Sequence, residues 1–296
     1  MSAEAPEKPA VKAKGPKEGT RLDRTYAWTG GLIGILVTTV VFVVPFIFIF
    51  LTASKTQREA ASLEFSWPEQ WRFFENLVEV VQARDYILIT AFVNSTIITV
   101  GAVTIMVVLA AMVGYVLQRR KTRLNPVVNF MVLAGLIVPP AVVPTIWLMD
   151  GIGIFRTMHG IILVQAAFGM AFCVLLFRAF VSTIPRELDE AAVMDGAGPV
   201  RLFFRVIMPL LKPVIVTVIV VQSVFVFNDF QTQLYFFPGA DNATVQVTLY
   251  NFQSQYQTSW NLLFMDILLI TVPMLVMYIF FNRQIVAGMT SGAVKG

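Results

Sequence analysis

The stretch ELDEAAVMDGAGPVRLFFRVIMP, residues 187–209, decides the fold because it is a polar interruption in a chain that is otherwise strongly apolar. Its first turn carries Glu187, Asp189 and Glu190, and a helix dipole favours anions at that end. Gly196 suits the left-handed residue that terminates a helix, and a glycine–proline pair then turns the chain. The pattern predicts a helix, a turn and a second short helix.

Long apolar runs flank this stretch and dominate the composition. The 296 residues are 57% hydrophobic and 14% charged, whereas a soluble domain carries about 25% charged residues. A helix needs about 20 apolar residues to cross a bilayer. Four charge-free runs cover residues 25–54, 86–118, 124–149 and 157–177, and two shorter runs cover 213–228 and 267–282, extended by 210–211 and 262–265. The sequence therefore predicts an all-α, polytopic membrane protein with six transmembrane helices in a domain of residues 25–282.

The basic residues predict how these spans are oriented. Six spans put both termini on one side of the membrane, and 17 of the 22 Lys and Arg residues fall on that side. Because cytoplasmic segments carry the excess of Lys and Arg, we expect both termini and the loop of residues 182–209 in the cytoplasm. The net charge of +4 follows from this topology, so we expect no nucleic-acid partner.

The two ends of the chain are predicted to be tails. Residues 1–24 are rich in Lys, Pro, Ala and Glu and have no apolar periodicity, which is typical of a disordered segment. Residues 283–296 follow the last apolar run and are expected to form a cytoplasmic C-terminal tail. The first apolar run is too long for a cleavable signal peptide, so we expect none.

Prolines interrupt the third run at GLIVPPAVVPTIW. Pro139, Pro140 and Pro144 remove backbone N–H donors that a helix needs. Such backbone is tolerated at membrane depth only against protein or a water-filled cavity. We therefore expect a broken span that faces the interior, with Pro139 and Pro140 beside the transport pathway. The alternative is a structural kink with no passage beside it.

Polar side chains in the other runs are candidates for a pathway lining. Asn94, Gln222, Asn228 and Asp229 lie in or next to the apolar zone, where polar groups are costly. Either they line a wet pathway, or they cap the ends of spans at the membrane interface. Gln165 in the fourth run leaves the same two interpretations open.

The segment SWPEQWRFFENLVEVVQ, outside the membrane in this topology, predicts an amphipathic helix. Trp71, Phe74, Leu77, Val78 and Val81 recur at helical spacing, and Ser66 is a suitable N-cap. We expect this helix to lie on the outer membrane face or on a partner.

Small residues in the cytoplasmic loop point to close contact with another backbone. Ala191, Ala192, Gly196 and Ala197 leave room for such an approach. A surface helix held by two spans could tilt both of them when it is pushed. The alternative is a loop that merely connects two spans, which would not need this pattern.

The loop also resembles a known motif. Glu190-Ala191-Ala192, then Gly196, then Val206-x-Met208-Pro209 is similar to the EAA motif of ABC importer membrane subunits. The flanking IPRELDEAA and MDGAG, together with FVNS, VPP, FND and the closing GMTSGAVKG, resemble the carbohydrate-uptake branch of the maltose-permease type. The resemblance covers about 200 residues, from the second span to the end. Val206, Met208 and Phe227 stand where Ile, Leu and Trp are usual.

The resemblance implies a type I ABC importer permease with a helix that couples to an ATPase. The residues implied in coupling are Glu190, Ala191, Ala192, Asp195, Gly196, Ala197 and Pro209, and those implied in a C-terminal ATPase contact are Gly292 and Lys295. Implied partners are a second homologous permease subunit, two cytoplasmic ATPase subunits, an extracytoplasmic solute-binding protein, a sugar and membrane lipid. The location implied is a bacterial or archaeal cell membrane.

No enzymatic chemistry is expected in this chain itself. It contains no Gly-Lys dipeptide and therefore no phosphate-binding P-loop. We find no nucleophile–base arrangement and no paired-histidine metal site, so we expect no catalytic residue, no metal and no cofactor. The resemblance implies that ATP and Mg²⁺ are bound by the partner ATPase.

Two other functions remain open. A secondary transporter independent of any ATPase would need acidic residues within its spans, and only Asp229 and Asp266 are candidates, both near span ends. A permease of the same type could instead carry a non-sugar solute such as glycerol phosphate, which would favour an arginine-lined pocket. The spans contain no interior arginine.

Overall fold

The computed structural model describes residues 31–239, 241–253 and 258–293 of the chain. The chain divides into two compact units, Met1–Phe48 and Ile49–Gly296. In the first unit, the described residues are helical and belong to the apolar segment Gly31–Ala53, which contains the π-helical η1 (Thr39–Val43) and the start of α2 (Val44–Ala53). The predicted tail at residues 1–24 lies outside the described residues.

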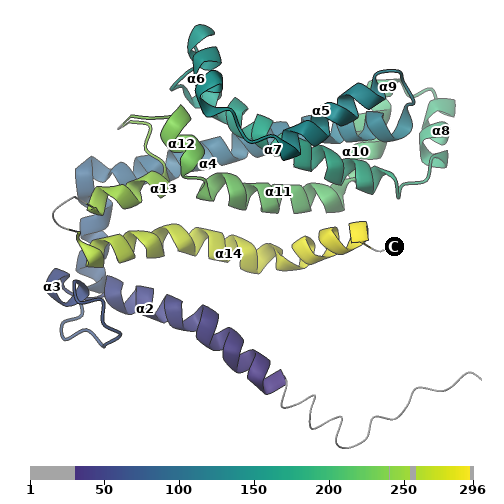
Figure 1. Ribbon diagram of the computed structural model, residues 1–296. Helices are drawn as coiled ribbons and strands as arrows, with labels where there is room; N and C mark the ends of the chain where they lie inside the picture. Colours follow the sequence, from purple (N-terminus) through teal and green to yellow (C-terminus); the bar gives the residue numbers. More distant parts are fainter. Residues whose placement is uncertain (1–30, 240, 254–257, 294–296) are drawn as a thin grey trace, which may run out of the picture. The chain divides into compact units, whose positions relative to one another are not determined.

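The second unit is built of helices, and its described residues form no named strand (Figure 1). In chain order the elements are α3 (Gln57–Ala60), α4 (Phe73–Arg119), α5 (Asn125–Ile137), α6 (Val142–Gly151), α7 (Met158–Val181), α8 (Glu187–Met194), α9 (Pro199–Leu202), η2 (Phe203–Ile207), α10 (Met208–Leu210), α11 (Lys212–Asn228), α12 (Gln231–Phe236), α13 (Val245–Thr248), η3 (Leu249–Phe252) and α14 (Trp260–Ala293). The all-α class is confirmed.

Among the described residues, the six predicted spans correspond to four apolar helices and two bent pairs, which make six spans if each bent pair is one span. Gly31–Ala53, α4, α7 and the first part of α14 are long and apolar enough to cross a membrane. The pair α5 and α6 is bent by 116°, and the pair Pro199–Leu210 and α11 is bent by 75°. Helix α14 continues through residues 283–293, so that part of the predicted C-terminal tail is helical.

The bend between α5 and α6 lies at the predicted prolines. Helix α5 ends at Ile137 and α6 begins at Val142, and Pro139 and Pro140 occupy the gap. The break is therefore confirmed. Both prolines are exposed on the surface of this chain, so the expectation that they face its interior is wrong for the single chain. The loss of two adjacent N–H donors explains the break but does not decide which surface covers it.

The core of the second unit lies where α4, α7 and α11 pack together, with α14 alongside α11 (Figure 1). Ala110 and Ala111 on α4 and Phe177 on α7 are fully buried in this core. Gly114 lets α4 approach the backbone of α7 closely: a Cβ placed there would lie 2.9 Å from the Arg178 backbone nitrogen and 2.9 Å from the Phe177 Cβ. Small residues commonly set such helix contacts in membranes.

Buried polar groups join the ends of α2, α4 and α14 at one corner of this unit. The Asn76 side chain donates from Nδ2 to the carbonyls of Ala53 and Lys55, at 2.8 Å each, and Asn261 Nδ2 donates to Asn76 Oδ1 at 3.1 Å. Lys55 is buried, and its ammonium donates to the Glu64 carbonyl at 2.7 Å and to Ser66 Oγ at 2.9 Å.

The predicted amphipathic helix forms the first part of α4, and its start was predicted wrongly. The helix begins at Phe73 with Arg72 as N-cap, and the Ser66 hydroxyl accepts from the Lys55 ammonium instead of capping a helix. Non-helical backbone at residues 83–86 separates this part from the membrane-spanning part of α4. Trp71, Phe74 and Val78 are exposed, which leaves an apolar face free for the membrane or a partner.

The contact at Gly114 can be tested by substitution. Gly114→Ala should lower the unfolding temperature in detergent, because the new methyl group overlaps backbone that cannot move away; overpacking of this kind costs about 1–3 kcal/mol. The matched control is Gly151→Ala at the end of α6, where an added methyl group would have no atom within 4 Å. Equal unfolding temperatures for the two variants would show that α4 and α7 do not pack this closely.

Candidate functional site

The polar stretch that opened the sequence forms two short helices at one end of the second unit. Helix α8 has its three acids in the first turn and ends at Met194. Gly196 follows with a φ of +80°, and the Ala197 N–H donates to the Ala192 carbonyl at 3.0 Å. The predicted helix, left-handed glycine and second helix α9 are therefore confirmed. Arg186 is the N-cap of α8 and makes no side-chain capping bond.

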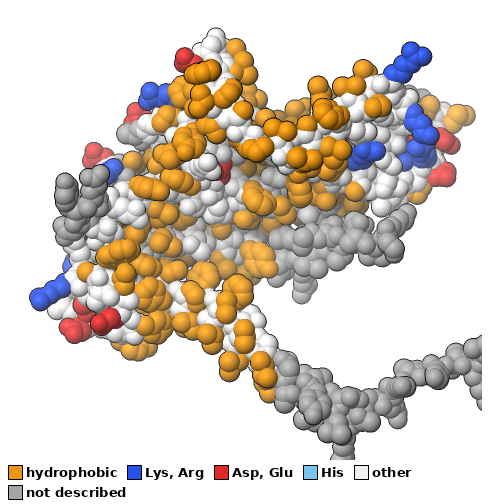
Figure 2. Space-filling view, viewed as in Figure 1, with side chains coloured by type: hydrophobic (Ala, Val, Ile, Leu, Met, Phe, Trp, Pro, Cys, Tyr) orange, Lys and Arg blue, Asp and Glu red, His pale blue; other side chains and the backbone are white. Residues whose placement is uncertain are grey.

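The residues of this segment divide between an inner and an outer face. Ala192 and Ala197 pack against the core, and their small side chains allow this close contact. The residues exposed on the outer face are Glu190, Ala191, Asp195, Gly196 and Pro209. Apolar side chains protrude beside them: Val193 is 57% exposed and Met194 is 86% exposed. Figure 2 shows acidic and basic side chains gathered at the end of the molecule where α8 and α9 lie.

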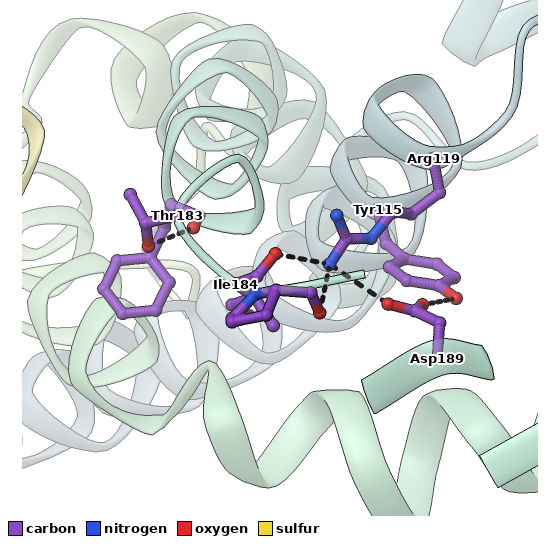
Figure 3. A network of polar contacts seen from close by, with 7 residues as sticks. Tyr115, Arg119, Thr183, Ile184 and Asp189 are labelled. Atoms are coloured by element: carbon purple, nitrogen blue, oxygen red, sulfur yellow. Dashed lines mark hydrogen bonds and ion pairs between the residues drawn. The ribbon is translucent and has the colours of Figure 1, made fainter. Parts of the chain in front are cut away.

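A polar cluster that the sequence did not reveal holds α8 to the end of α4 (Figure 3). Arg119 Nη2 lies 3.1 Å from Asp189 Oδ2 and donates to the Ile184 carbonyl at 2.8 Å. The Tyr115 hydroxyl donates to the other oxygen of Asp189. These residues also line a cavity of about 560 Å³ that reaches Glu190 and Met194. From sequence, Asp189 was assigned only to the helix dipole.

Three of the predicted pathway residues come together in a second cavity, of about 690 Å³. Gln222, Asn228 and Asp229 line it from α11 and its C-terminal cap. Gln165 of α7 also lines it and donates to Asp229 Oδ2 at 2.7 Å. The rings of Phe168, Phe172 and Phe225 form the apolar wall, which the sequence analysis missed because phenylalanine is ordinary in apolar helices.

Asp229 combines a cavity position with a hydrogen bond at the start of a helix, so the two interpretations of this residue stay open. It lines the cavity, and its Oδ1 accepts from the Thr232 N–H at 3.1 Å, in the first turn of α12. The Asn228 side chain is also held in place, since its Oδ1 accepts from Gln246 Nε2 at 3.0 Å. The cavity therefore carries amides and one carboxylate whose positions are set by hydrogen bonds.

The remaining predicted residues lie elsewhere. Asn94 donates from Nδ2 to the carbonyls of Asp241, at 3.1 Å, and Ala243, at 2.9 Å, and does not line this cavity. Pro139 and Pro140 do not line it either. Gly292 belongs to α14, and Lys295 lies outside the described residues.

Asp266 is the second acidic residue considered for the spans, and among the described residues it does not belong to a metal-binding cluster. Asp266 was expected near a span end; it is fully buried in α14, where Thr248 Oγ1 lies 3.0 Å from its Oδ2. Within the part of the chain that the structure describes, no group of three or more His, Cys, Asp or Glu side chains could hold a metal ion.

Two bacterial permease proteins are similar to this chain over most of their lengths. The melibiose/raffinose/stachyose import permease protein MelC of Bacillus subtilis is 32% identical over 256 residues, which cover 86% of this chain and 91% of that protein. The diacetylchitobiose uptake system permease protein NgcG of Streptomyces coelicolor is 30% identical over 277 residues, covering 92% of this chain and 90% of that protein.

A solved structure and a family model point to the same class of protein as these two relatives. A chain in the crystal structure of a bacterial ABC transporter involved in the import of the acidic polysaccharide alginate superposes with a TM-score of 0.76 at 20% identity, over 90% of this chain and 99% of that chain. The family model described as binding-protein-dependent transport system inner membrane component matches residues 106–289, which include the end of α4, the α8–α9 segment and the residues of the larger cavity. This chain belongs to the family of inner membrane components of binding-protein-dependent transport systems.

Proposed function

We propose that this chain is a permease subunit of an ATP-binding-cassette importer for a sugar. The observation that carries the proposal is the α8–α9 segment, which presents Glu190, Val193 and Met194 at one end of the helical bundle. An exposed apolar tip beside a carboxylate is suited to a protein partner, because it combines buried area with a directional ionic contact. The membrane-spanning family and the sugar-import relatives support this assignment.

The partner at this segment is a cytoplasmic ATPase, present as two copies in the assembly. Glu190, Ala191, Asp195 and Gly196 form the contact surface, and Ala192, Ala197 and Pro209 shape it. Gly292 and Lys295 at the C-terminus add a second contact with the ATPases. ATP and Mg²⁺ bind the ATPases, and this chain holds no cofactor of its own. Both termini then lie in the cytoplasm, as the basic residues indicate.

The larger cavity provides this subunit's share of the sugar pathway, which a second homologous permease completes. The amides of Gln165, Gln222 and Asn228 can exchange hydrogen bonds with sugar hydroxyls. The Asp229 carboxylate favours a neutral sugar over an anionic solute, because a like charge at short range is repelled. No arginine is among the residues that line the cavity, which argues against glycerol phosphate.

Transport proceeds by alternating access between inward-open and outward-open states. Closure of the ATPases around ATP pushes α8, and the bundle responds because its packed helices have discrete arrangements rather than a continuous range. An extracytoplasmic binding protein delivers the sugar to the outward-open state. The ATPases and the binding protein act by their different contacts with the two states.

The coupling role of α8 predicts a specific loss. Glu190→Lys should leave the subunit inserted but reduce ATP-dependent sugar uptake at least about tenfold, the scale on which reversal of an interfacial charge acts. The control is Asp150→Lys, which makes the same change of charge at an exposed position on α6. Normal uptake by Glu190→Lys in vesicles that contain the whole transporter would refute the role.

The turn after α8 predicts a different pattern. At a φ of +80° with open space around the Cβ position, the backbone alone decides what Gly196 tolerates. Gly196→Asn should therefore keep most uptake, because asparagine enters the left-handed region readily, whereas Gly196→Val should lose it. Equal uptake by the two variants would show that this turn does not shape the contact.

The cavity can be probed by thiol labelling in a Cys173→Ser background, since Cys173 is the one cysteine in the sequence. A water-soluble maleimide should label Asn228→Cys severalfold faster than Ser95→Cys, whose site is fully buried on α4. The transported sugar, presented by its binding protein, should slow labelling of Asn228→Cys only. Equal labelling of both sites would exclude a water-accessible pathway here.

A further inference from the structure

The cluster of Tyr115, Arg119 and Asp189 attaches the α8 segment to a single membrane helix. Its contacts on the membrane side come from the last two turns of α4. The guanidinium of Arg119 reaches the Ile184 and Pro185 carbonyls before α8, at 2.8 and 3.5 Å, and the Asp189 carboxylate within its first turn (Figure 3). Contact both before α8 and within it fixes the direction of α8 as well as its position.

Tyr115 extends the attachment to the second short helix. Its hydroxyl donates to Asp189, and its ring lies 5.7 Å from the ring of Phe203, centroid to centroid, at the start of η2. One side chain of α4 therefore contacts both limbs of the segment. We call Tyr115, Arg119 and Asp189 the inner clamp.

Burial separates the inner clamp from an ordinary surface ion pair. The side chains of Arg119 and Asp189 are only 10% and 16% exposed. Exposed pairs contribute little, because water and salt screen them. A largely buried pair that loses one partner leaves the other charge without compensation, so the geometry of this contact is strongly enforced. By contrast, the neighbouring Arg120 is exposed.

Towards the start of its membrane-spanning part, at residues 94 and 95, α4 holds the loop that leads into α13. Asn94 donates to the carbonyls of Asp241 and Ala243, and Ser95 Oγ accepts from the Val245 N–H at 3.1 Å. Between residues 94 and 119 α4 is uninterrupted, a helical length of about 38 Å. One rigid helix thus carries α8 at one end and the loop that leads into α13 at the other.

We propose that α4 is the rod that transmits movement between α8 and the loop before α13, and that the inner clamp is the positioning device that makes α8 and α4 move as one body. The inference rests on the proposed function, because it assumes that α8 contacts an ATPase. Arg119, Asp189 and Tyr115 touch neither nucleotide nor sugar and act through the placement of α8. Loss of the inner clamp lets α8 shift against α4, so that movement of the ATPases is no longer passed to α4.

The test uses the whole transporter in liposomes, with its ATPases, the second permease and the sugar-loaded binding protein. Arg119→Gln and Asp189→Asn should each leave co-purification of the ATPases and basal hydrolysis intact. Stimulation of hydrolysis by the loaded binding protein, and the sugar imported per ATP, should fall by about tenfold, as expected for loss of a charged hydrogen bond. Arg120→Gln, which removes the exposed neighbouring charge, should behave as the unaltered protein.

A double variant shows whether the pair acts as a unit. Arg119→Gln combined with Asp189→Asn should be no worse than either single change, because both remove the same contact. Losses that multiply, or stimulation within about twofold of Arg120→Gln, the spread expected for unrelated surface changes, would overturn the proposal.

If the charge variants fail to assemble, Tyr115→Phe tests the inner clamp instead. It removes one oxygen and keeps the ring against Phe203, so the bundle should remain intact. A fewfold loss of binding-protein stimulation with unchanged basal hydrolysis supports the inner clamp, and unchanged stimulation contradicts it. Glu190→Lys separates the two hypotheses: if it imports sugar normally, the proposed function fails, whereas if it alone is defective, only the inner clamp fails.

Discussion

Backbone hydrogen bonding in lipid is the constraint on which the rest of this structure depends. Lipid offers no hydrogen-bond partners, so every lipid-exposed N–H and C=O must find a partner within the protein. Helix α7, and α4 beyond residue 86, meet this demand without interruption over lengths that suffice to cross a membrane. The departures occur beside proline, between α5 and α6 and between α10 and α11. The second departure lets the α8–α10 segment turn away from the direction of α11.

Local chemistry made much of this arrangement predictable from sequence. The turn at Gly196 needs only the backbone freedom of glycine, and the break at Pro139 and Pro140 needs only their missing donors, so both were recognised. Gln222 and Asp229 were recognised as pathway candidates because polar groups are rare in apolar runs, and they lie in one cavity. Each of these signals is carried by a few adjacent residues.

What could not be predicted depends on partners distant in the chain. Ser66 looked like an N-cap, but the ammonium of Lys55 occupies its hydroxyl. Asn94 was grouped with the cavity residues, yet its amide binds two carbonyls nearly 150 residues away. The pairing of Arg119 with Asp189 joins segments 70 residues apart, as the Tyr115 contact spans 74. Periodicity and capping rules describe neighbours along one helix and carry no information about contacts between segments distant in the chain.

The division of the inner clamp between two distant segments has a consequence for the exchange of parts among related transporters. A chimaera that receives only the α8–α9 loop of a relative keeps Tyr115 and Arg119 but acquires a foreign acceptor. Its exposed face, which we propose binds an ATPase, could then be unaltered while the loop is misplaced on its supporting helix. Grafts that carry the end of α4 together with the loop preserve the matched set. Under the proposed coupling role, the set of residues that must be inherited together is therefore discontinuous in the chain.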